Sequence, residues 1–249
     1  MAFGKGIRPP APSARQAIST VTFRQLENPL LEPESQAGVE GGVELYAGDR
    51  ASLSLTGYTQ HADGLIQEVI VNREGTRAIQ YQNVGRIANQ GLELEGSARS
   101  GRVRAAVSFS VIASRVRALS GSYSGDLAVG DRVPEVPGSS GLASLNWSLG
   151  RTELTLGTSH IGSWIGYDWV QFINGQQDTL ASQPSTLRGY LRRYPSIQKP
   201  FVAISRPVLH DFEWFGRIDN LMNVQRNERD NLQITAGRTV TIGLRVGRS

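Results

Sequence analysis

The side chains that could form a hydrolytic site are few and widely separated in this sequence. The histidines, His61, His160 and His210, each stand among stretches that alternate apolar and polar residues. A histidine beside a serine could activate it as a nucleophile, but the G-x-S-x-G spacing of a nucleophile elbow does not occur. The 249 residues contain no cysteine, which excludes a disulfide framework and a cysteine nucleophile. We therefore predict no catalytic residue.

Three carboxylates could in principle bind a metal ion. Asp126, Asp131 and Glu135 share one Gly/Ser/Pro-rich segment, and carboxylate oxygens are the ligands that calcium prefers. Their spacing is not that of an EF-hand loop, and the absence of cysteine excludes thiolate metal sites. A solvated acidic loop is the simpler interpretation, so we predict neither a metal site nor a cofactor.

The charge of the chain is modestly basic. It has 26 Lys and Arg against 22 Asp and Glu, a formal net charge of +4. The basic residues are nearly all arginine, and no basic run is longer than Arg192-Arg193. Nucleic-acid binding needs basic residues gathered on one face or one segment. Their scatter here predicts no nucleic-acid partner.

The segments that must position any site alternate apolar and polar residues, which is a period of two. In Gly91-Leu92-Glu93-Leu94-Glu95-Gly96, the two leucines alternate with the two glutamates. Successive side chains of a β-strand point to opposite faces, so such a strand has one apolar face and one charged face. The same alternation recurs along the chain.

About ten strands follow from this alternation. We predict them near residues 39–45, 53–71, 77–82, 91–98, 103–111, 143–149, 152–164, 196–204, 209–218 and 240–246. Short turns are expected near residues 48, 100, 150 and 206, whereas residues 118–139 and 165–193 form long polar loops. The 13–26 segment is expected to be an ordered loop rather than a helix.

Connections that alternate between short and long are typical of outer-membrane β-barrels, which have short periplasmic turns and long external loops. No run approaches the roughly 18 apolar residues of a membrane helix. We therefore predict an all-β fold, an antiparallel up-and-down meander of about ten strands that forms part of a transmembrane β-barrel. A soluble β-sandwich that acts as a binding module is the first alternative, and a small barrel enzyme resembling a lipase is the second.

Five segments, in order along nearly the whole chain, carry a resemblance to a known family. They are residues 4–10, 28–34 with 40–44, 83–85 with 91–96, 133–137, and 219–223 with 237–240. In that order they resemble the C-terminal half of a TonB-dependent outer-membrane receptor. The segments that precede this half in the family, including a plug, have no counterpart here, and the last residues of the chain lack the family's usual terminal aromatic residue.

The resemblance implies that residues 1–249 are the C-terminal portion of such a barrel, without its plug and its N-terminal strands. It implies a location in the outer membrane of a Gram-negative bacterium and uptake of a scarce nutrient, with a ferric siderophore as the default ligand. The implied partners are the missing plug and barrel half, the TonB complex acting through the plug, the lipid bilayer and the external ligand. It implies no enzyme activity.

Two sets of site residues follow from this interpretation. The charges expected to face the lumen are Glu93, Glu95, Arg104, Glu213, Arg217 and Arg245. They could guide an anionic substrate, contact the plug, or only solvate the inner wall. Among the aromatic residues of the long loops, Tyr123, Trp169 and Tyr190 are candidates for substrate contact. For Trp164, Tyr167 and Trp169, an interfacial aromatic girdle is the favoured role.

Overall fold

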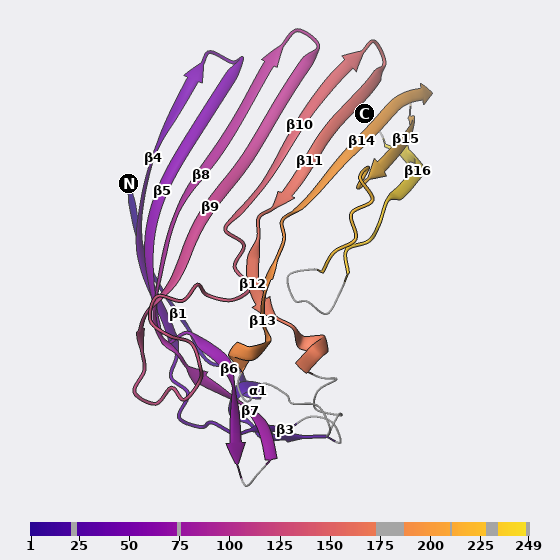
Figure 1. Ribbon diagram of the computed structural model, residues 1–249. Coiled ribbons are helices and arrows are strands. Elements are labelled where there is room, and N and C mark those ends of the chain that lie inside the picture. Colours follow the sequence, from indigo (N-terminus) through magenta and orange to yellow (C-terminus); the bar gives the residue numbers. More distant parts are fainter. Residues whose placement is uncertain (21–23, 74–75, 173–186, 210, 228–233, 248–249) are drawn as a thin grey trace.

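The computed structural model is dominated by one ten-stranded antiparallel sheet (Figure 1). The structure describes residues 1–20, 24–73, 76–172, 187–209, 211–227 and 234–247. In spatial order the strands are β1 (Ala2–Arg8), β4 (Glu34–Ala47), β5 (Ala51–Asp63), β8 (Gly85–Ser100), β9 (Val103–Leu119), β10 (Ser139–Leu149), β11 (Thr152–Ile161), β14 (Ile197–Leu209), β15 (Phe212–Asp219) and β16 (Thr239–Val246). The predicted meander is confirmed.

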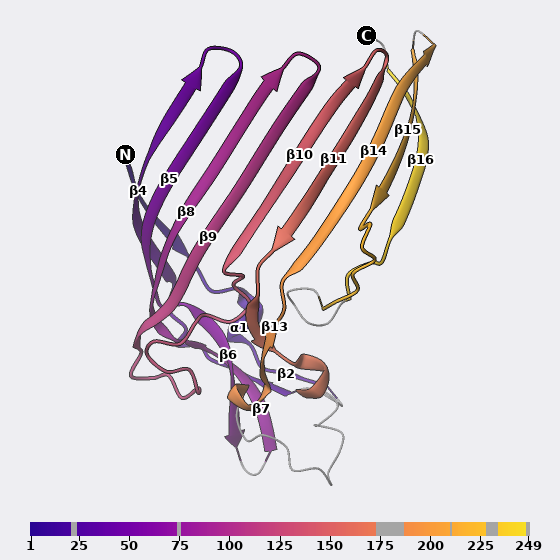
Figure 2. The same ribbon diagram turned by 45° about the horizontal axis from the view of Figure 1, so that its top comes forward.

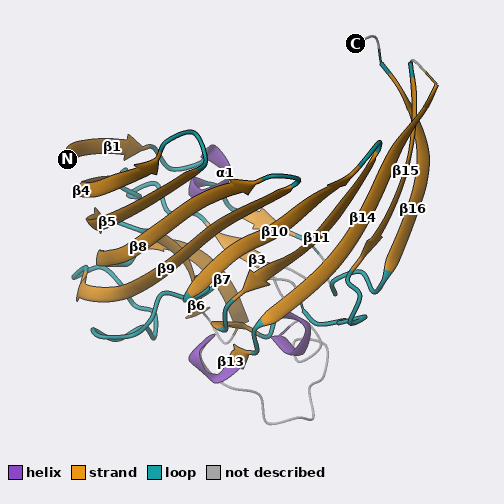
Figure 3. Cartoon of the chain, turned by 90° about the horizontal axis from the view of Figure 1, so that it is seen from above, coloured by secondary structure: helices purple, strands orange, loops and turns teal. Residues whose placement is uncertain are grey.

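The sheet is open. Its edges are β1 and β16, and no pairing within the described residues joins them. Viewed from above, the sheet bends along its width while its two edges stay apart (Figure 3). An unclosed, curved meander is the arrangement expected of part of a barrel.

Short turns and long connections alternate along the sheet, as predicted. The turns between β4 and β5, β8 and β9, and β10 and β11 lie together at the upper end in Figures 1 and 2, which we call the turn end. Gly48, Gly101 and Gly150 supply their positive φ angles of 56°, 56° and 66°, which glycine adopts without steric cost. The longer connections gather at the opposite end, the loop end.

The strand register keeps each face of the sheet uniform in character. Leu55 pairs with Leu94, which pairs with Phe109, whereas the adjacent row runs from Thr56 through Glu93 to Ser110. The apolar face carries, among others, Val43, Leu45, Leu53, Leu55, Leu92, Leu94, Val107, Phe109, Leu145, Leu156, Val202, Ile218 and Val240. The polar face carries, among others, Glu44, Ser54, Thr56, Glu93, Glu95, Arg104, Ser108, Ser144, Asn146, Thr155, Glu213, Arg217 and Arg245.

The buried hydrophobic residues of the described chain lie at the loop end. One cluster joins Ile87 and Val116 to Leu127 and Val133, because the 120–138 connection folds over the polar face there. The other gathers Ile79, Tyr167, Phe172 and Tyr190. The turn half of the sheet is a single layer, in which large apolar side chains such as Leu45 (61% exposed) and Ile242 (79% exposed) remain uncovered.

Two small sheets and short helical segments build the loop end. The first sheet has the order β2 (Ile18–Ser19), β3 (Arg24–Leu26), β7 (Thr76–Asn83) and β6 (Ile66–Arg73), and the second pairs β12 (Trp164–Tyr167) with β13 (Leu191–Tyr194). Among the described residues, the helical segments are α1 (Pro12–Arg15), residues 169–172 and the 3₁₀ turn η1 (Leu187–Tyr190). Among the described residues no helix has the length and apolar composition needed to cross a bilayer.

Several predicted boundaries were wrong. The strand expected over residues 53–71 is two strands, β5 and β6, separated at Gly64 with φ +72°. The strand near residues 77–82 belongs to a small sheet, and β1 takes its place in the large one. The turn expected near residue 206 lies between Leu209 and Phe212, and Pro207 is tolerated within β14 beside a register shift. Within residues 13–26, α1, β2 and β3 stand where an ordered loop was expected.

Candidate functional site

The six charged residues predicted as a set share the polar face of the large sheet. Glu93 and Glu95 lie on β8, Arg104 on β9, Glu213 and Arg217 on β15, and Arg245 on β16. Glu44 on β4 lies in the same row as Glu95, with Ser54 between them. The face is therefore acidic on the β4–β8 side and mixed on the β15–β16 side.

The β15–β16 side has its charges paired. Arg245 Nη1 lies 2.9 Å from Glu213 Oε2, and Arg217 Nη2 lies 2.7 Å from Asp219 Oδ1. The Arg217 guanidinium also lies 4.1 Å from the centroid of the Phe201 ring, a cation–π distance. In contrast, Glu93 and Glu95 form no ion pair with any described residue. The acidic side is thus the part of the polar face that can accept outside cations or donors.

A hollow of about 450 Å³ opens on the acidic side. Five of its thirteen lining residues are serines, and Ser52 and Ser97 share a hydrogen bond of 2.9 Å between neighbouring strands. Glu44 accepts a 2.5 Å hydrogen bond from the Tyr46 hydroxyl, and Glu95 lies across the hollow from it. Short side chains here leave room for a polar segment to approach the sheet backbone closely.

The candidate substrate-contacting aromatics all lie at the loop end but differ in exposure. Tyr190 is fully buried, with its ring centroid 5.3 Å from that of Phe172 in an edge-to-face contact. Trp169 is partly buried, and its ring centroid lies 5.6 Å from that of Phe172. Tyr123 is partly buried against the cluster of Val116 and Leu127. Trp169 and Tyr123 keep some free surface, whereas Tyr190 has none and contacts Phe172, on which Trp169 also packs.

The aromatic girdle expected from Trp164 and Tyr167 was wrong. Trp164 is 1% exposed and stacks on Tyr194 at 5.5 Å, and Tyr167 is 7% exposed within the loop-end core. Burial raises the pKa of the Tyr167 hydroxyl well above its usual range. Both residues lie on β12, which pairs with β13 in a two-stranded sheet separate from the large sheet.

The acidic loop is held by an arginine rather than left solvated. Arg188 of η1 forms a two-pronged pair with Asp131, at 2.5 Å from Nη1 to Oδ2 and 3.1 Å from Nη2 to Oδ1. Its backbone N–H donates to the Asp126 carboxylate. These hydrogen bonds hold the pKa of Asp131 below its usual range. Within the described residues, no group of three or more potential ligands could hold a metal ion.

A serine–histidine contact that the sequence spacing did not reveal joins β10 and β11. Ser139 Oγ lies 3.1 Å from His160 Nε2, and the imidazole stacks on Phe109 with centroids 6.1 Å apart. No described carboxylate pairs with His160, so the pair lacks the third group of a hydrolase triad. His61 is exposed on β5, and His210 lies outside the described residues.

Comparison with known proteins agrees with this geometry. The profile described as "TonB dependent receptor-like, beta-barrel" matches residues 1–221. This chain belongs to the TonB-dependent receptor β-barrel family. No curated protein matches it by sequence.

Solved structures of a transporter and two uptake receptors share its fold. The copper transporter OprC superimposes with a TM-score of 0.68 at 13% identity, over 98% of this chain and 36% of that one. The ferric yersiniabactin uptake receptor FyuA from Yersinia pestis superimposes with a TM-score of 0.64 at 18% identity, over 98% of this chain and 34% of that one. The ferric enterobactin receptor PfeA from Pseudomonas aeruginosa superimposes with a TM-score of 0.67 at 14% identity, over 98% of this chain and 37% of that one. The chain thus spans about a third of the length of these proteins.

Proposed function

We propose that residues 1–249 form the C-terminal portion of a TonB-energised receptor in the outer membrane of a Gram-negative bacterium. The observation that carries the proposal is the separation of an apolar from a polar face across the large sheet, such as Leu55, Leu94 and Phe109 against Thr56, Glu93 and Ser110. A single-layer sheet with one largely apolar, uncovered face is unstable in water and stable against lipid.

The length of the apolar face supports a bilayer-spanning role. On β9, apolar residues alternate from Val103 to Ala113 before Arg115 interrupts them on the same face. Ten residue steps of about 3.4 Å give roughly 34 Å along the strand. At the usual tilt near 45° this length crosses about 24 Å, close to the apolar band of outer-membrane barrels.

The polar face would line the lumen, and further strands and a plug would complete the protein. Unpaired backbone groups along β1 and β16 cannot find water in a bilayer, so both edges require partner strands. The acidic hollow around Glu44 and Glu95 would lie against the plug, which carries the contacts with TonB. The six charged side chains on this face would then be solvated in a water-containing lumen instead of being buried in a dry core.

The ligand that we propose is a large iron chelate such as a ferric siderophore. Two of the structures described above are named as receptors for ferric yersiniabactin and ferric enterobactin. Long loops lie on the external side of such barrels, so Trp169 and Tyr123 would contact the ligand there. Tyr190 would hold the Trp169 ring in place through Phe172.

The test is uptake by a reconstituted split receptor. This chain would be co-expressed with the plug and N-terminal strands of its parent gene in cells that lack other siderophore receptors. We expect accumulation of a ferric siderophore that requires TonB, and none when this chain is expressed alone. Active uptake by the chain alone, or uptake that ignores TonB, would refute the proposal. A matched pair of strains with and without TonB is the control.

A further inference from the structure

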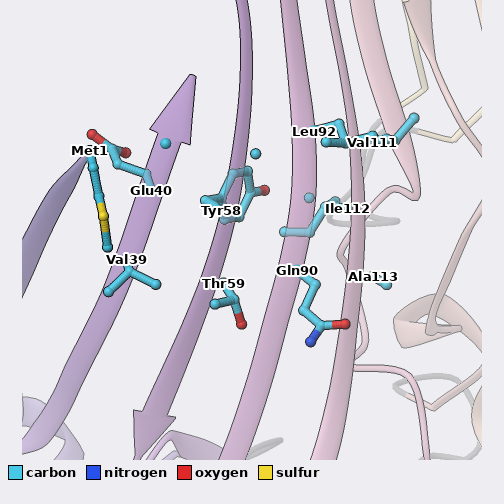
Figure 4. A pocket seen from close by; sticks show the side chains of 13 residues that line it. Met1, Val39, Glu40, Tyr58, Thr59, Gln90, Leu92, Val111, Ile112 and Ala113 are labelled. Carbon is cyan, nitrogen blue, oxygen red and sulfur yellow. The ribbon is translucent and has the colours of Figure 1, made fainter. Parts of the chain in front are cut away.

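The hollows of the large sheet differ in the chemistry of their linings. One of about 720 Å³ lies between β4 and β9, where Val39, Leu92 and Val111 border it (Figure 4), and no described arginine or lysine lines it. Another, of about 140 Å³, lies at the turn end, and we call it the arginine hollow. Its lining consists of Arg99, Gly101, Arg102, Val103, Arg104, Asn146, Ser148 and Glu153.

Two arginines of this hollow stand directly opposite each other on the polar face. Arg99 of β8 pairs in register with Arg104 of β9, and it shares its face of the strand with Glu93 and Glu95. Like charges in this position repel each other and lower the stability of a strand pair. None of Arg99, Arg102 and Arg104 forms an ion pair with a described residue. The repulsion is therefore not relieved within the described part of the chain.

The neighbouring strand β10 adds hydrogen-bond donors to the arginine hollow. Asn146 lies beside Arg104 in the register, and the Thr155 hydroxyl donates to Asn146 Oδ1 over 2.7 Å. The side-chain nitrogen of Asn146 has no acceptor among the described residues, so it can donate to a ligand. Ser148 lies two residues further along the same face and adds a hydroxyl. Because guanidinium groups have no acceptor atoms, Glu153 is the one charged acceptor of the lining.

The charge of the arginine hollow matches a phosphate group. Its three guanidinium groups and one carboxylate leave a local charge of +2. A phosphate group carries about −1.5 to −2 at neutral pH and presents three strong acceptor oxygens. Arginine binds phosphate through paired N–H groups in a fixed fork. A single carboxylate would balance only half of the local charge.

We propose that the arginine hollow binds the phosphate group of a small, water-soluble molecule. The phosphate lies between Arg99 and Arg104, relieves their repulsion, and accepts hydrogen bonds from Arg102 and the Asn146 amide. A soluble molecule fits better than a phospholipid, because the hollow opens on the polar face and acyl chains would need the apolar face. Short turns lie on the periplasmic side of outer-membrane barrels, so the position of the hollow at the periplasmic mouth of the lumen rests on the proposed function.

The test is isothermal titration calorimetry of the full chain, folded in non-ionic micelles and titrated with inorganic phosphate at low ionic strength. The double variant R99Q with R104Q should weaken phosphate binding about tenfold or more, because it removes charge-assisted hydrogen bonds. The matched control, R50Q with R151Q, removes two arginines from turns at the same end that do not line the hollow. It should change phosphate binding little.

Two further measurements distinguish a phosphate site from a structural cluster. Glu153→Gln removes the carboxylate of the lining and should tighten phosphate binding several-fold. Phosphate should also raise the unfolding temperature of the unaltered chain, because a ligand of the folded state stabilises that state, and R99Q with R104Q should remove this shift. Without phosphate, the double variant should be at least as stable as the unaltered chain, since the opposed charges are gone.

Competition identifies the kind of phosphate compound. Glycerol 3-phosphate should displace inorganic phosphate from the chain, whereas dipalmitoyl phosphatidic acid added to the micelles should not. Stronger displacement by the phosphatidic acid would assign the hollow to a lipid headgroup and overturn the proposal.

Three other results would overturn it. The first is equal phosphate affinity in the R99Q/R104Q and R50Q/R151Q variants, and the second is weaker binding in Glu153→Gln. The third is loss of phosphate binding when the chain is assembled with its plug and remaining strands, since a carboxylate of the plug would then hold the arginines. Failure of siderophore uptake with phosphate binding intact would contradict the proposed function and leave this site standing.

Discussion

Tyr58 and Gly91 lie directly opposite each other on β5 and β8, and the phenol ring fills the space that a side chain at 91 would need. A Cβ added at Gly91 would lie 2.5 Å from Tyr58 Cζ. Phe215 covers Gly243 in the same way, with 2.6 Å to its Cζ. Both pairs are on the polar face, where a ring laid over a glycine shields the backbone of the neighbouring strand.

The third such pair gives a stability prediction. Phe201 lies opposite Gly157, where an added Cβ would lie 2.6 Å from the ring Cε1, and Arg217 stacks on the same ring. Gly157→Ala should displace the ring and lower the free energy of unfolding by about 1–3 kcal/mol. Gly41→Ala, which enters open space, should change it little. Urea unfolding of both variants in micelles measures the difference, and equal stabilities would contradict the packing argument.

Adjacent residues on β9 test the assignment of the two faces. Phe109→Arg places a charge on the apolar face near the middle of the band and should cost about 2–4 kcal/mol of unfolding free energy in a bilayer. Ser110→Arg places the same charge on the polar face and should cost far less. Folding titrations in lipid vesicles measure both, and a larger penalty for Ser110→Arg would reverse the assignment.

The loop-end core predicts a separate pattern for Tyr190. Because its ring is fully buried against Phe172, Tyr190→Ala should destabilise the loop end by about 3–5 kcal/mol. Limited proteolysis should then cut the loop end faster while the large sheet stays protected. Met222→Ala, at a side chain 66% exposed, is the control and should leave cleavage unchanged. Unchanged cleavage of Tyr190→Ala would show that its ring is not part of a core.

The pair of Asp131 and Arg188 predicts a pH dependence. The fold holds the pKa of Asp131 below the usual value near 4, so the pair stabilises the 120–138 connection above that pH. The contribution is lost as pH falls from about 4 through the lower pKa of the folded state. The protection factors against hydrogen exchange at the amides of Val116 and Gly130, which join β9 to this connection, should therefore fall in acid, once the intrinsic exchange rate at each pH is divided out.

Asp131→Asn is the control for this pH effect. The amide cannot titrate, so exchange at the same two amides should be faster at neutral pH and should lose its acid-dependent step. A step of undiminished size in Asp131→Asn would assign the pH dependence to another group.

The wall of the fold could be predicted because lipid and water act on alternate residues of each strand. That pattern places Leu92 and Glu93 on opposite faces whatever the partner strands are. The pattern does not reveal β1. Its residues on the apolar face are Phe3, Lys5 and Ile7, and Lys5 interrupts the apolar series, while the alternate positions include Gly4 and Gly6, which have no side chains. The alternation also continues on both sides of Gly64, so it predicts one strand where the structure has two, β5 and β6.

The candidate site was only partly accessible to the same reasoning. Alternation identifies the shared face of Glu93, Arg104 and Arg217 without the structure. It cannot indicate that Arg245 of β16 is paired with Glu213 of β15 while Glu93 has no ion pair with a described residue, because local sequence does not specify cross-strand contacts. Nor can it show that Tyr190 is buried and Trp169 partly free, since loop packing depends on segments more than a hundred residues apart, such as Ile79 and Tyr190.

The most direct test of the account is which solvent each face of β8 contacts in a membrane. Because the chain has no cysteine, single cysteines at Leu92, Glu93, Leu94 and Glu95 can be spin-labelled without background. In vesicles containing the assembled barrel, labels at 92 and 94 should collide with oxygen dissolved in lipid, and labels at 93 and 95 with a water-soluble nickel chelate. Equal access of the chelate to all four positions would contradict the account.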